Sequence, residues 1–224
     1  MLSDDDKKLL QRSLDFWDKI NPAEKDLLLN NISNIGYAPG ENIHSADNDC
    51  IGVMIVKKGT LRTYILSEEG REITLYRLYE SEVCILSASC LLSEITFDVH
   101  IDAEIPSQIL LINSNVFENI KSRNIYVENF VYRTIIDKFS DVMWAMQQIL
   151  FMSFDKRLAV FLLDEISRES TDIINLTHDQ IARYLGSARE VVSRMLKYFE
   201  NENILELSRG KIQVIDRKKL KKIV

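Results

Sequence analysis

A chain of 224 residues with 46% hydrophobic and 28% charged side chains can fold as one large domain or two modest ones. Its net charge of −6 argues against a simple nucleic-acid coat, and its three cysteines lack the CxxC spacing of a zinc site or a disulfide framework. The acidic start "MLSDDDKKLL" is unlike a secretory signal, and no apolar run approaches the roughly 20 residues that span a bilayer. We therefore expect a cytoplasmic protein with reduced thiols and no membrane partner.

Charge is distributed unevenly along the chain. Residues 1–152 hold 14 basic and 23 acidic side chains, whereas residues 153–224 hold 14 and 11. From Leu176 onward the balance is 11 basic to 6 acidic, and the chain ends in "DRKKLKKIV". This pattern predicts that only the C-terminal part meets a polyanion, with a solvated lysine-rich terminus as the alternative.

The first third of the chain changes from a helical period to a strand period. Residues 4–32 are typical of short helices, with Asn21 as a cap and Pro22 at the first helical position. After Ile35, "IGVMIVKKGTLRTYILSEEGREITLYRL" alternates, and the turn signals "KKG" and "SEEGR" predict hairpins. Further strands are expected in "VHIDAEI" and "SQILLIN". Short strands at this spacing favour an antiparallel jelly-roll barrel.

From Ile125 to about Leu150 the pattern is helical without interruption. One apolar stripe on this stretch has the 4, 3, 4, 3 spacing of a two-helix seam. The stripe comprises Ile135, Phe139, Val142, Met146 and Ile149. Such stripes also serve as intramolecular core, but a long helix between two domains favours a dimer seam.

The last third predicts a winged helix-turn-helix. Ser153 is expected to cap the amphipathic helix "FDKRLAVFLLDEISRES", and "ILELSRGKIQVID" indicates two strands around the turn "SRG". Between them, "THDQIARYLGSAREVVSRMLKYFE" predicts two helices, each begun by a capping box: Thr177 with Gln180 and Ser187 with Glu190. Gly186 can take the left-handed conformation that the short turn demands.

The second helix of this pair leaves a polar outer face. The buried seam is expected to comprise Ile181, Leu185, Val192, Met195 and Leu196. The outer face carries Arg189, Glu190, Ser193 and Arg194, whose side chains suit base edges: arginine binds guanine O6 and N7, and glutamate accepts from cytosine N4. Thr177, His178, Ser187 and Lys197 are the candidates for phosphate contacts. A capping role for Glu190 and a solvated helix face are the alternatives.

These motifs resemble the Crp/Fnr family of bacterial transcription regulators over nearly the full length. The most specific part is "LTHDQIARYLGSAREVVSRMLKYFENENILELSRGKIQVIDRKKL", in which Arg189, Glu190, Ser193 and Arg194 match the Arg-Glu and Ser-Arg pairs of the family's recognition helix. "SFDKRLAVFLL" resembles the helix after the family's hinge, and residues 37–84 resemble strands of its cyclic-nucleotide-binding-like barrel. The resemblance implies a homodimer on an inverted-repeat operator in double-stranded DNA, an effector acting at the barrel, and RNA polymerase as a further partner.

The expected fold is therefore α+β in three parts. Residues 1–124 form the sensor β-barrel with its N-terminal helices, residues 125–152 the dimerisation helix, and residues 153–224 the winged helix-turn-helix.

The sensor departs from the family's pattern for cyclic nucleotides. Family members that bind cyclic nucleotides carry a Gly-Glu pair and a nearby Arg-Ser or Arg-Thr, which "YESEVCILSASCLLSEITFDVHID" lacks. The positions at which they place purine-contacting hydroxyls correspond to Val142 and Met143, which have no hydroxyl group. The effector is therefore expected to be a small molecule other than cyclic AMP. An iron–sulfur cluster with cysteines near the N-terminus is excluded, because the first cysteine is Cys50.

The segment "CILSASC" stands where the family places its ligand-binding loop. An effector pocket in this segment would be lined by Cys84, Ser87, Ser89 and Cys90. Alternatively, the two thiols could sense oxidation. A tight core filled by cysteine and alanine, with the serines capping a short helix, is the interpretation we favour.

The predicted function is a DNA-binding transcription regulator that is not an enzyme and needs no cofactor or metal. The alternative is a cupin-like small-molecule-binding protein or enzyme with a helical appendage. A metal-dependent cupin needs gathered histidine ligands, usually with an H-x-H pair, whereas His44, His100 and His178 are far apart in the sequence.

Overall fold

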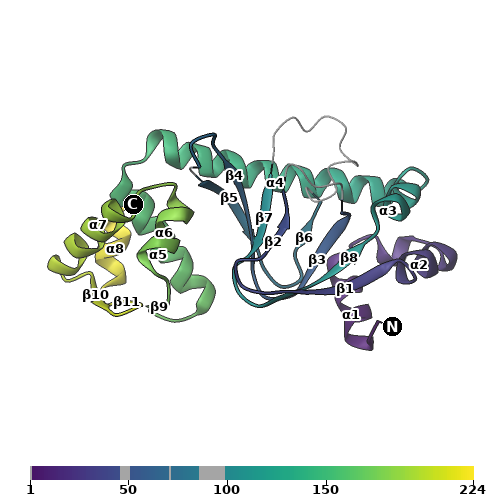
Figure 1. The fold of residues 1–224 in the computed structure, drawn as a ribbon, viewed down its shortest axis with the longest axis horizontal. Helices are drawn as coiled ribbons and strands as arrows, with labels where there is room; N and C mark the ends of the chain where they lie inside the picture. The colour runs from purple at the N-terminus through teal and green to yellow at the C-terminus, as the bar shows by residue number, and fades with distance from the viewer. Residues whose placement is uncertain (1, 46–50, 71, 86–98) are drawn as a thin grey trace. The chain divides into compact units, whose positions relative to one another are not determined.

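The computed structural model describes residues 2–45, 51–70, 72–85 and 99–224, and these divide into two compact units (Figure 1). One unit comprises residues 1–66 and 75–142, and the other comprises residues 67–74 and 143–224. No described helix combines the length and apolar character needed to cross a membrane.

The first unit begins with helices that cover one end of its sheets. They are α1 (Asp4–Ser13), the 3-10 turn η1 (Trp17–Lys19) and α2 (Pro22–Leu29). The expected cap of α2 is confirmed: Asn21 and Glu24 form a reciprocal capping box, with Pro22 at the first turn. Helix α1 is joined to β3 (Val53–Lys58) by an ion pair between buried Asp6 and Lys57, at 2.7 Å.

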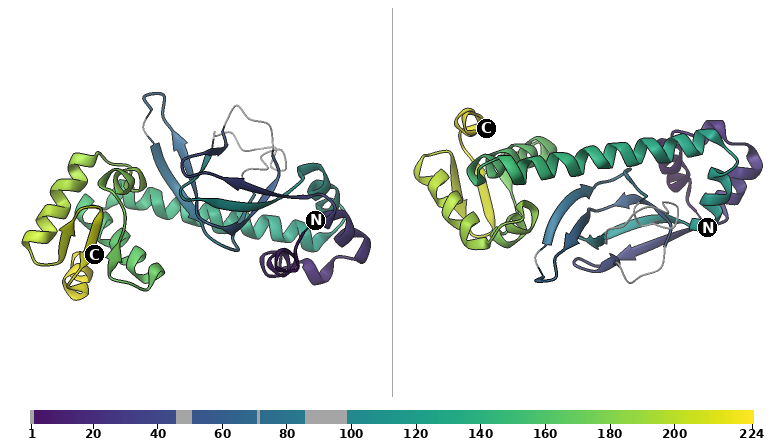
Figure 2. Two further views of the ribbon diagram at one scale, coloured as in Figure 1. Left: turned by 60° about the horizontal axis from the view of Figure 1, so that its bottom comes forward. Right: turned by 90° about the horizontal axis from the view of Figure 1, so that it is seen from above.

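Two four-stranded antiparallel sheets form the body of this unit. The strands are β1 (Ile32–Tyr37), β2 (Asn42–His44), β3, β4 (Leu61–Leu66), β5 (Glu72–Leu78), β6 (Val83–Cys84), β7 (His100–Ala103) and β8 (Ser107–Ile112). One sheet has the order β1-β8-β3-β6 and the other β2-β7-β4-β5. The expected jelly-roll character is confirmed, but as two separate sheets facing each other and not as a closed barrel (Figures 1 and 2).

The turn "KKG" does not close a hairpin, which corrects the prediction for β3 and β4. Strand β3 pairs with β8 and β6, whereas β4 pairs with β7 and β5. The chain changes sheets at Gly59, whose φ of +99° and contact with Ser107 leave no room for a side chain, because a Cβ there would lie 2.3 Å from Ser107 Oγ. The second turn does join neighbouring strands, β4 and β5.

Helix α3 (Ser114–Lys121) leads into the long helix α4 (Ile125–Phe151), as the helical period from Ile125 predicted. The first turns of α4 pack on the unit's own core through Val127, Phe130 and Val131. Figures 1 and 2 show this part of α4 running beside the sheets.

The second unit has the expected winged helix-turn-helix order. It contains α5 (Phe154–Glu169), β9 (Ile173–Ile174), α6 (His178–Leu185), α7 (Arg189–Asn201), β10 (Leu205–Ser208), β11 (Lys211–Val214) and α8 (Arg217–Ile223). Strands β10 and β11 form the predicted hairpin, and the short β9 extends it to the order β10-β11-β9. Sequence patterns missed β9 and α8. All the helices of this unit share one apolar core that includes Leu158, Leu196 and Leu220.

Candidate DNA interface

The start of α6 is fixed by a reciprocal capping box, as predicted. The backbone N–H of Gln180 donates to Thr177 Oγ1 at 3.2 Å, and the N–H of Thr177 donates to Gln180 Oε1 at 2.8 Å. Two of the unsatisfied amides of the helix start are thereby bound, so the first turn is held in one conformation.

The turn between α6 and α7 depends on Gly186, as predicted. This residue has φ of 57° and ψ of 45°, in the left-handed region, and the next amide, of Ser187, donates to Ala182 O at 2.9 Å. Ala182 is buried where the helices meet. The expected seam between the helices is present: Ile181, Leu185, Val192 and Leu196 are buried, and Met195 packs against them.

The second predicted capping box does not form. Helix α7 begins at Arg189 with Ala188 at the capping position, and among the described residues no side chain caps it. Because the Ser187 amide closes the preceding turn, Ser187 lies one residue too early to cap, and Glu190 takes the second helical position instead of the third. Glu190 is therefore exposed and serves no capping role.

The outer face of α7 presents the predicted polar set to solvent. Arg189, Glu190, Arg194 and Lys197 are exposed, and Ser193 is half-buried. Arg189 lies 3.7 Å from Asp179 of α6. Lys197 lies 2.5 Å from Glu200, whose carboxylate also accepts the N–H of Leu207 in β10 at 3.0 Å. Lys197 and that hydrogen bond lower the pKa of Glu200, so α7 and the wing are joined through an ionised carboxylate.

One contact of this face was not foreseen from the sequence. The ring Nδ1 of His178, at the start of α6, lies 2.8 Å from the Ser193 hydroxyl on α7. His178 and Ser193 were predicted to play separate roles, at a phosphate and at a base. Fifteen positions separate them, so no local pattern could have indicated the pair.

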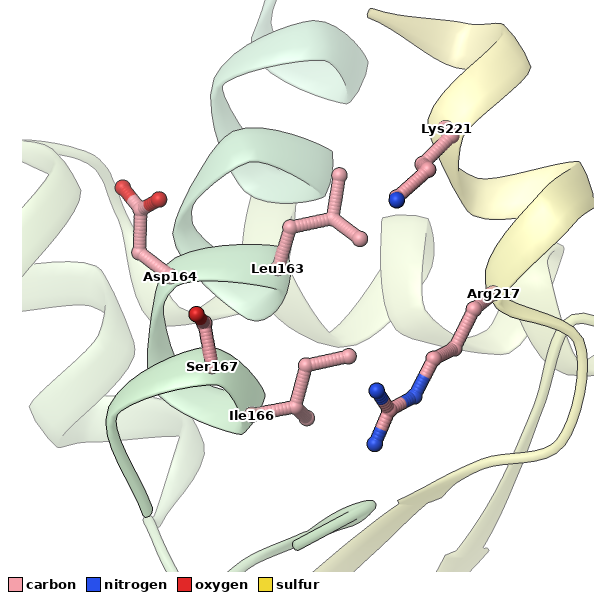
Figure 3. A pocket seen from close by; sticks show the side chains of 6 residues that line it. All are labelled: Leu163, Asp164, Ile166, Ser167, Arg217 and Lys221. Atoms are coloured by element: carbon pink, nitrogen blue, oxygen red, sulfur yellow. The ribbon is translucent and has the colours of Figure 1, made fainter. Parts of the chain in front are cut away.

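The C-terminal helix α8 carries most of the basic tail. Asp216 caps it by accepting the N–H groups of Lys218 and Lys219, and the buried Leu220 holds it in the core of the unit. A hollow of about 290 Å³ lies beside it. Figure 3 shows its lining residues, which are Leu163, Asp164, Ile166, Ser167, Arg217 and Lys221. None of the residues predicted to contact DNA lies in this hollow.

The apolar stripe of α4 is divided between two environments. Ile135 and Val142 pack against the cores of the first unit. Phe139, Met146 and Ile149 are exposed. The exposed apolar side chains form a second stripe with spacing 4, 3, 4, 3, 4, which comprises Tyr132, Ile136, Phe139, Met143, Met146 and Leu150. We call this set the exposed α4 stripe.

Known proteins agree with this architecture. Residues 156–223 match the model of the Crp-like helix-turn-helix domain. The solved structure of a Crp/Fnr-family transcriptional regulator from Eubacterium rectale is 44% identical, covers 94% of this chain and 98% of its own, and superposes with a TM-score of 0.89. The chain belongs to the Crp/Fnr family.

One more distant solved structure shares the fold of this Crp/Fnr chain, and a further relative matches it in sequence. FixK2 from Bradyrhizobium japonicum is 20% identical, covers 86% of this chain and 96% of its own, and has a TM-score of 0.71. The transcriptional regulatory protein btr of Bordetella pertussis is 21% identical over 193 residues, which are 83% of this chain and 78% of that protein. Membership in this family identifies the chain as a DNA-binding transcription regulator.

The first unit of this Crp/Fnr chain places Cys84 inside its core. The side chain is 1% exposed and packs among apolar residues of both sheets. Ser87, Ser89 and Cys90 lie outside the described residues. Within the described parts of the chain, no group of three or more His, Cys, Asp or Glu side chains is placed to hold a metal ion.

Next to Cys84 lies a buried tyrosine, Tyr76, for which no sequence pattern indicated a role. Burial raises the pKa of Tyr76 well above its ordinary value, and the neighbouring Cys84 adds to the rise. The Lys138 ammonium of α4 lies 4.8 Å from the centre of the Tyr76 ring. Tyr76 therefore connects the core between the two sheets to the helix that bears the exposed α4 stripe.

Proposed function

We propose that Arg189, Glu190, Ser193 and Arg194 read a DNA half-site, with one copy of α7 in the major groove. The observation that carries this proposal is Glu190, an exposed carboxylate at the start of α7 that serves no cap. The helix dipole favours an acid in this first turn, and base reading gives the carboxylate a further role, because glutamate can accept from cytosine N4. The adjacent arginines supply the matching donors for guanine.

Thr177, His178, Ser187 and Lys197 surround this reading face and are the proposed phosphate contacts. They lie at the start of α6, in the turn and on the outer side of α7. Contacts of this kind position a protein on DNA without selecting a sequence. The Lys197 ammonium exchanges its partner Glu200 for a phosphate in this proposal.

Selection of binding sites from randomised DNA tests the reading role. Replacing Glu190 by alanine should cost about 1–3 kcal/mol on the preferred site and relax its sequence preference. Replacing Glu202, an exposed acid at the end of α7, removes the same charge and should leave the preference unchanged. Lys197→Ala should weaken all sequences alike and reduce the salt dependence by about one counterion. An unchanged preferred sequence in the Glu190 variant would contradict the proposal.

The exposed α4 stripe supports the second element of the proposal, a homodimer. Two parallel copies of α4 joined along this stripe would present two reading helices, which should lie about 34 Å apart on an inverted repeat. Compared with the five residues predicted from the sequence, the proposed seam keeps Phe139 and Met146 and uses Ile136 and Met143 in place of Ile135 and Val142, which pack on the first unit. It also uses Leu150 in place of its exposed neighbour Ile149.

The sensor unit is proposed to respond to a small molecule other than cyclic AMP or to a redox signal. Tyr76 is buried beside Cys84, and its ring lies 4.8 Å from the Lys138 ammonium of α4, so a ligand or an oxidised thiol there would act on the dimer helix. Mass spectrometry of small molecules released from the purified protein is the direct test. We further propose that the protein works in the cytoplasm, recruits or blocks RNA polymerase, and catalyses no reaction.

A further inference from the structure

The reading face of α7 is contacted from the first turn of α6. His178 Nδ1 lies 2.8 Å from Ser193 Oγ, and the next residue, Asp179, lies 3.7 Å from the Arg189 guanidinium. Two consecutive residues of one helix thus meet two of the four proposed reading residues of the other.

Both ends of the His178–Ser193 hydrogen bond are held by regular structure. His178 is the first residue of α6, where the Thr177–Gln180 capping box fixes the backbone. Ser193 lies on α7 beside Val192, which is fully buried in the domain core. Because neither residue is on a loop, the two side chains are in place before DNA arrives.

The chemistry of this pair decides how Ser193 can meet a base. A serine hydroxyl has one proton to donate and two lone pairs, whereas imidazole Nδ1 either accepts or donates. Where Nδ1 accepts, the Ser193 hydroxyl donates its hydrogen bond to the imidazole. Ser193 can then only accept from an amino group such as cytosine N4 or adenine N6. Where Nδ1 donates, the hydroxyl proton stays available for an acceptor such as guanine N7 or thymine O4.

We infer that His178 is a specificity-determining residue of this regulator, because it sets whether Ser193 donates to or accepts from a base. The inference rests on the proposed reading role of α7 and adds a residue outside the recognition helix to it. Asp179 forms a second contact between the helices, an ion pair with Arg189. That exposed ion pair is weak, so a DNA phosphate or base can replace it.

For His178 this inference replaces the phosphate contact proposed above, and the two roles predict different results. Loss of a phosphate contact weakens all DNA sequences alike, whereas loss of a positioning residue changes the preference at one base pair. His178 is half-buried at its helix start, and its substitution leaves the capping box intact. The variants should therefore fold.

The test compares selected half-sites for wild type, His178→Ala, Ser193→Ala and the double variant. We expect His178→Ala to alter the preference at the same base pair as Ser193→Ala, by about tenfold, and the double variant to match Ser193→Ala alone. His178→Asn places a polar group near the Nδ1 position and should retain the wild-type preference. His178→Gln places its polar group near Nε2 and should behave as alanine does.

In the selections, the inference is overturned by uniform weakening of every half-site in His178→Ala, or by effects of the two single substitutions that add in the double variant. A DNA-independent measurement is the ¹⁵N shift of His178 Nδ1, which should change in Ser193→Ala; an unchanged shift also contradicts the pair. If wild type shows no preferred half-site, or Glu190→Ala leaves it unchanged, the proposed function fails. If only the His178 variants behave as wild type, the further inference alone fails.

Discussion

Replacing Phe139 and Met143 by aspartate should turn a dimer into monomers. These side chains are 63% and 46% exposed in the single chain, so roughly half of each is available for burial against a second chain. Full burial of such a side chain contributes about 1.5–3 kcal/mol, and half of it about 0.8–1.5 kcal/mol. The four copies in a dimer therefore account for about 3–6 kcal/mol, which raises the dissociation constant by about 10²- to 10⁴-fold. Unpaired carboxylates in the seam add to this loss.

Sedimentation equilibrium over a wide range of protein concentrations measures the change. Ser140→Asp with Gln147→Asp adds the same two charges at exposed positions of α4 beside the stripe, and this variant should stay dimeric. Circular dichroism should show an intact fold in both variants, because none of the four side chains belongs to a core of the single chain. A Phe139/Met143 variant that dimerises as tightly as wild type would refute the reasoning.

Two further predictions concern stability. Asp6→Asn should destabilise the first unit by about 1–3 kcal/mol at neutral pH, because Lys57 loses its ionised partner. Burial alone would raise the pKa of Asp6, but hydrogen bonds from Lys57 and Ser3 and the charge of Lys57 outweigh it and lower the pKa. This stability is present above the unfolded pKa of about 3.9 and is lost as pH falls through the folded value, so acid titrations of the two proteins should converge. Gly186→Ala should cost about 1–2 kcal/mol in thermal unfolding, because alanine resists φ of 57°. Ser170→Gly, at φ of 52° after α5, should instead raise the unfolding temperature, because glycine adopts this conformation without strain. If both substitutions changed the unfolding temperature in the same direction, this explanation would be wrong.

Elements whose signals lie within a few residues could be predicted from the sequence. The cap at Asn21, the capping box at Thr177, the left-handed Gly186 and the long period of α4 all depend on residues within a few positions of one another, and the structure contains each of them. The same locality explains why the helix-turn-helix and its outer face were foreseen. A side chain's face on a helix follows from its position in the turn.

Pairing and packing across distant residues depended on the tertiary structure. Strands β3 and β4 have an ordinary hairpin pattern, yet each pairs with strands far along the chain, because sheet partners are selected by burial of both sheets together. The cap predicted from Ser187 and Glu190 does not form, because the Ser187 amide closes the turn on Ala182 and α7 starts one residue later than the capping box requires.

The face of α4 shows the division between the two kinds of information most directly. Its sequence determined a long helix with apolar side chains around much of its circumference, including Ile135, Ile136, Val142 and Met143. Periodicity could not tell which stripe meets the sheets and which stays exposed, because both have the spacing of a seam. Only the packed sensor core decided it, since burial of one stripe leaves the neighbouring stripe on the surface. The His178–Ser193 bond has the same origin: two helices had to pack before residues 15 positions apart could meet.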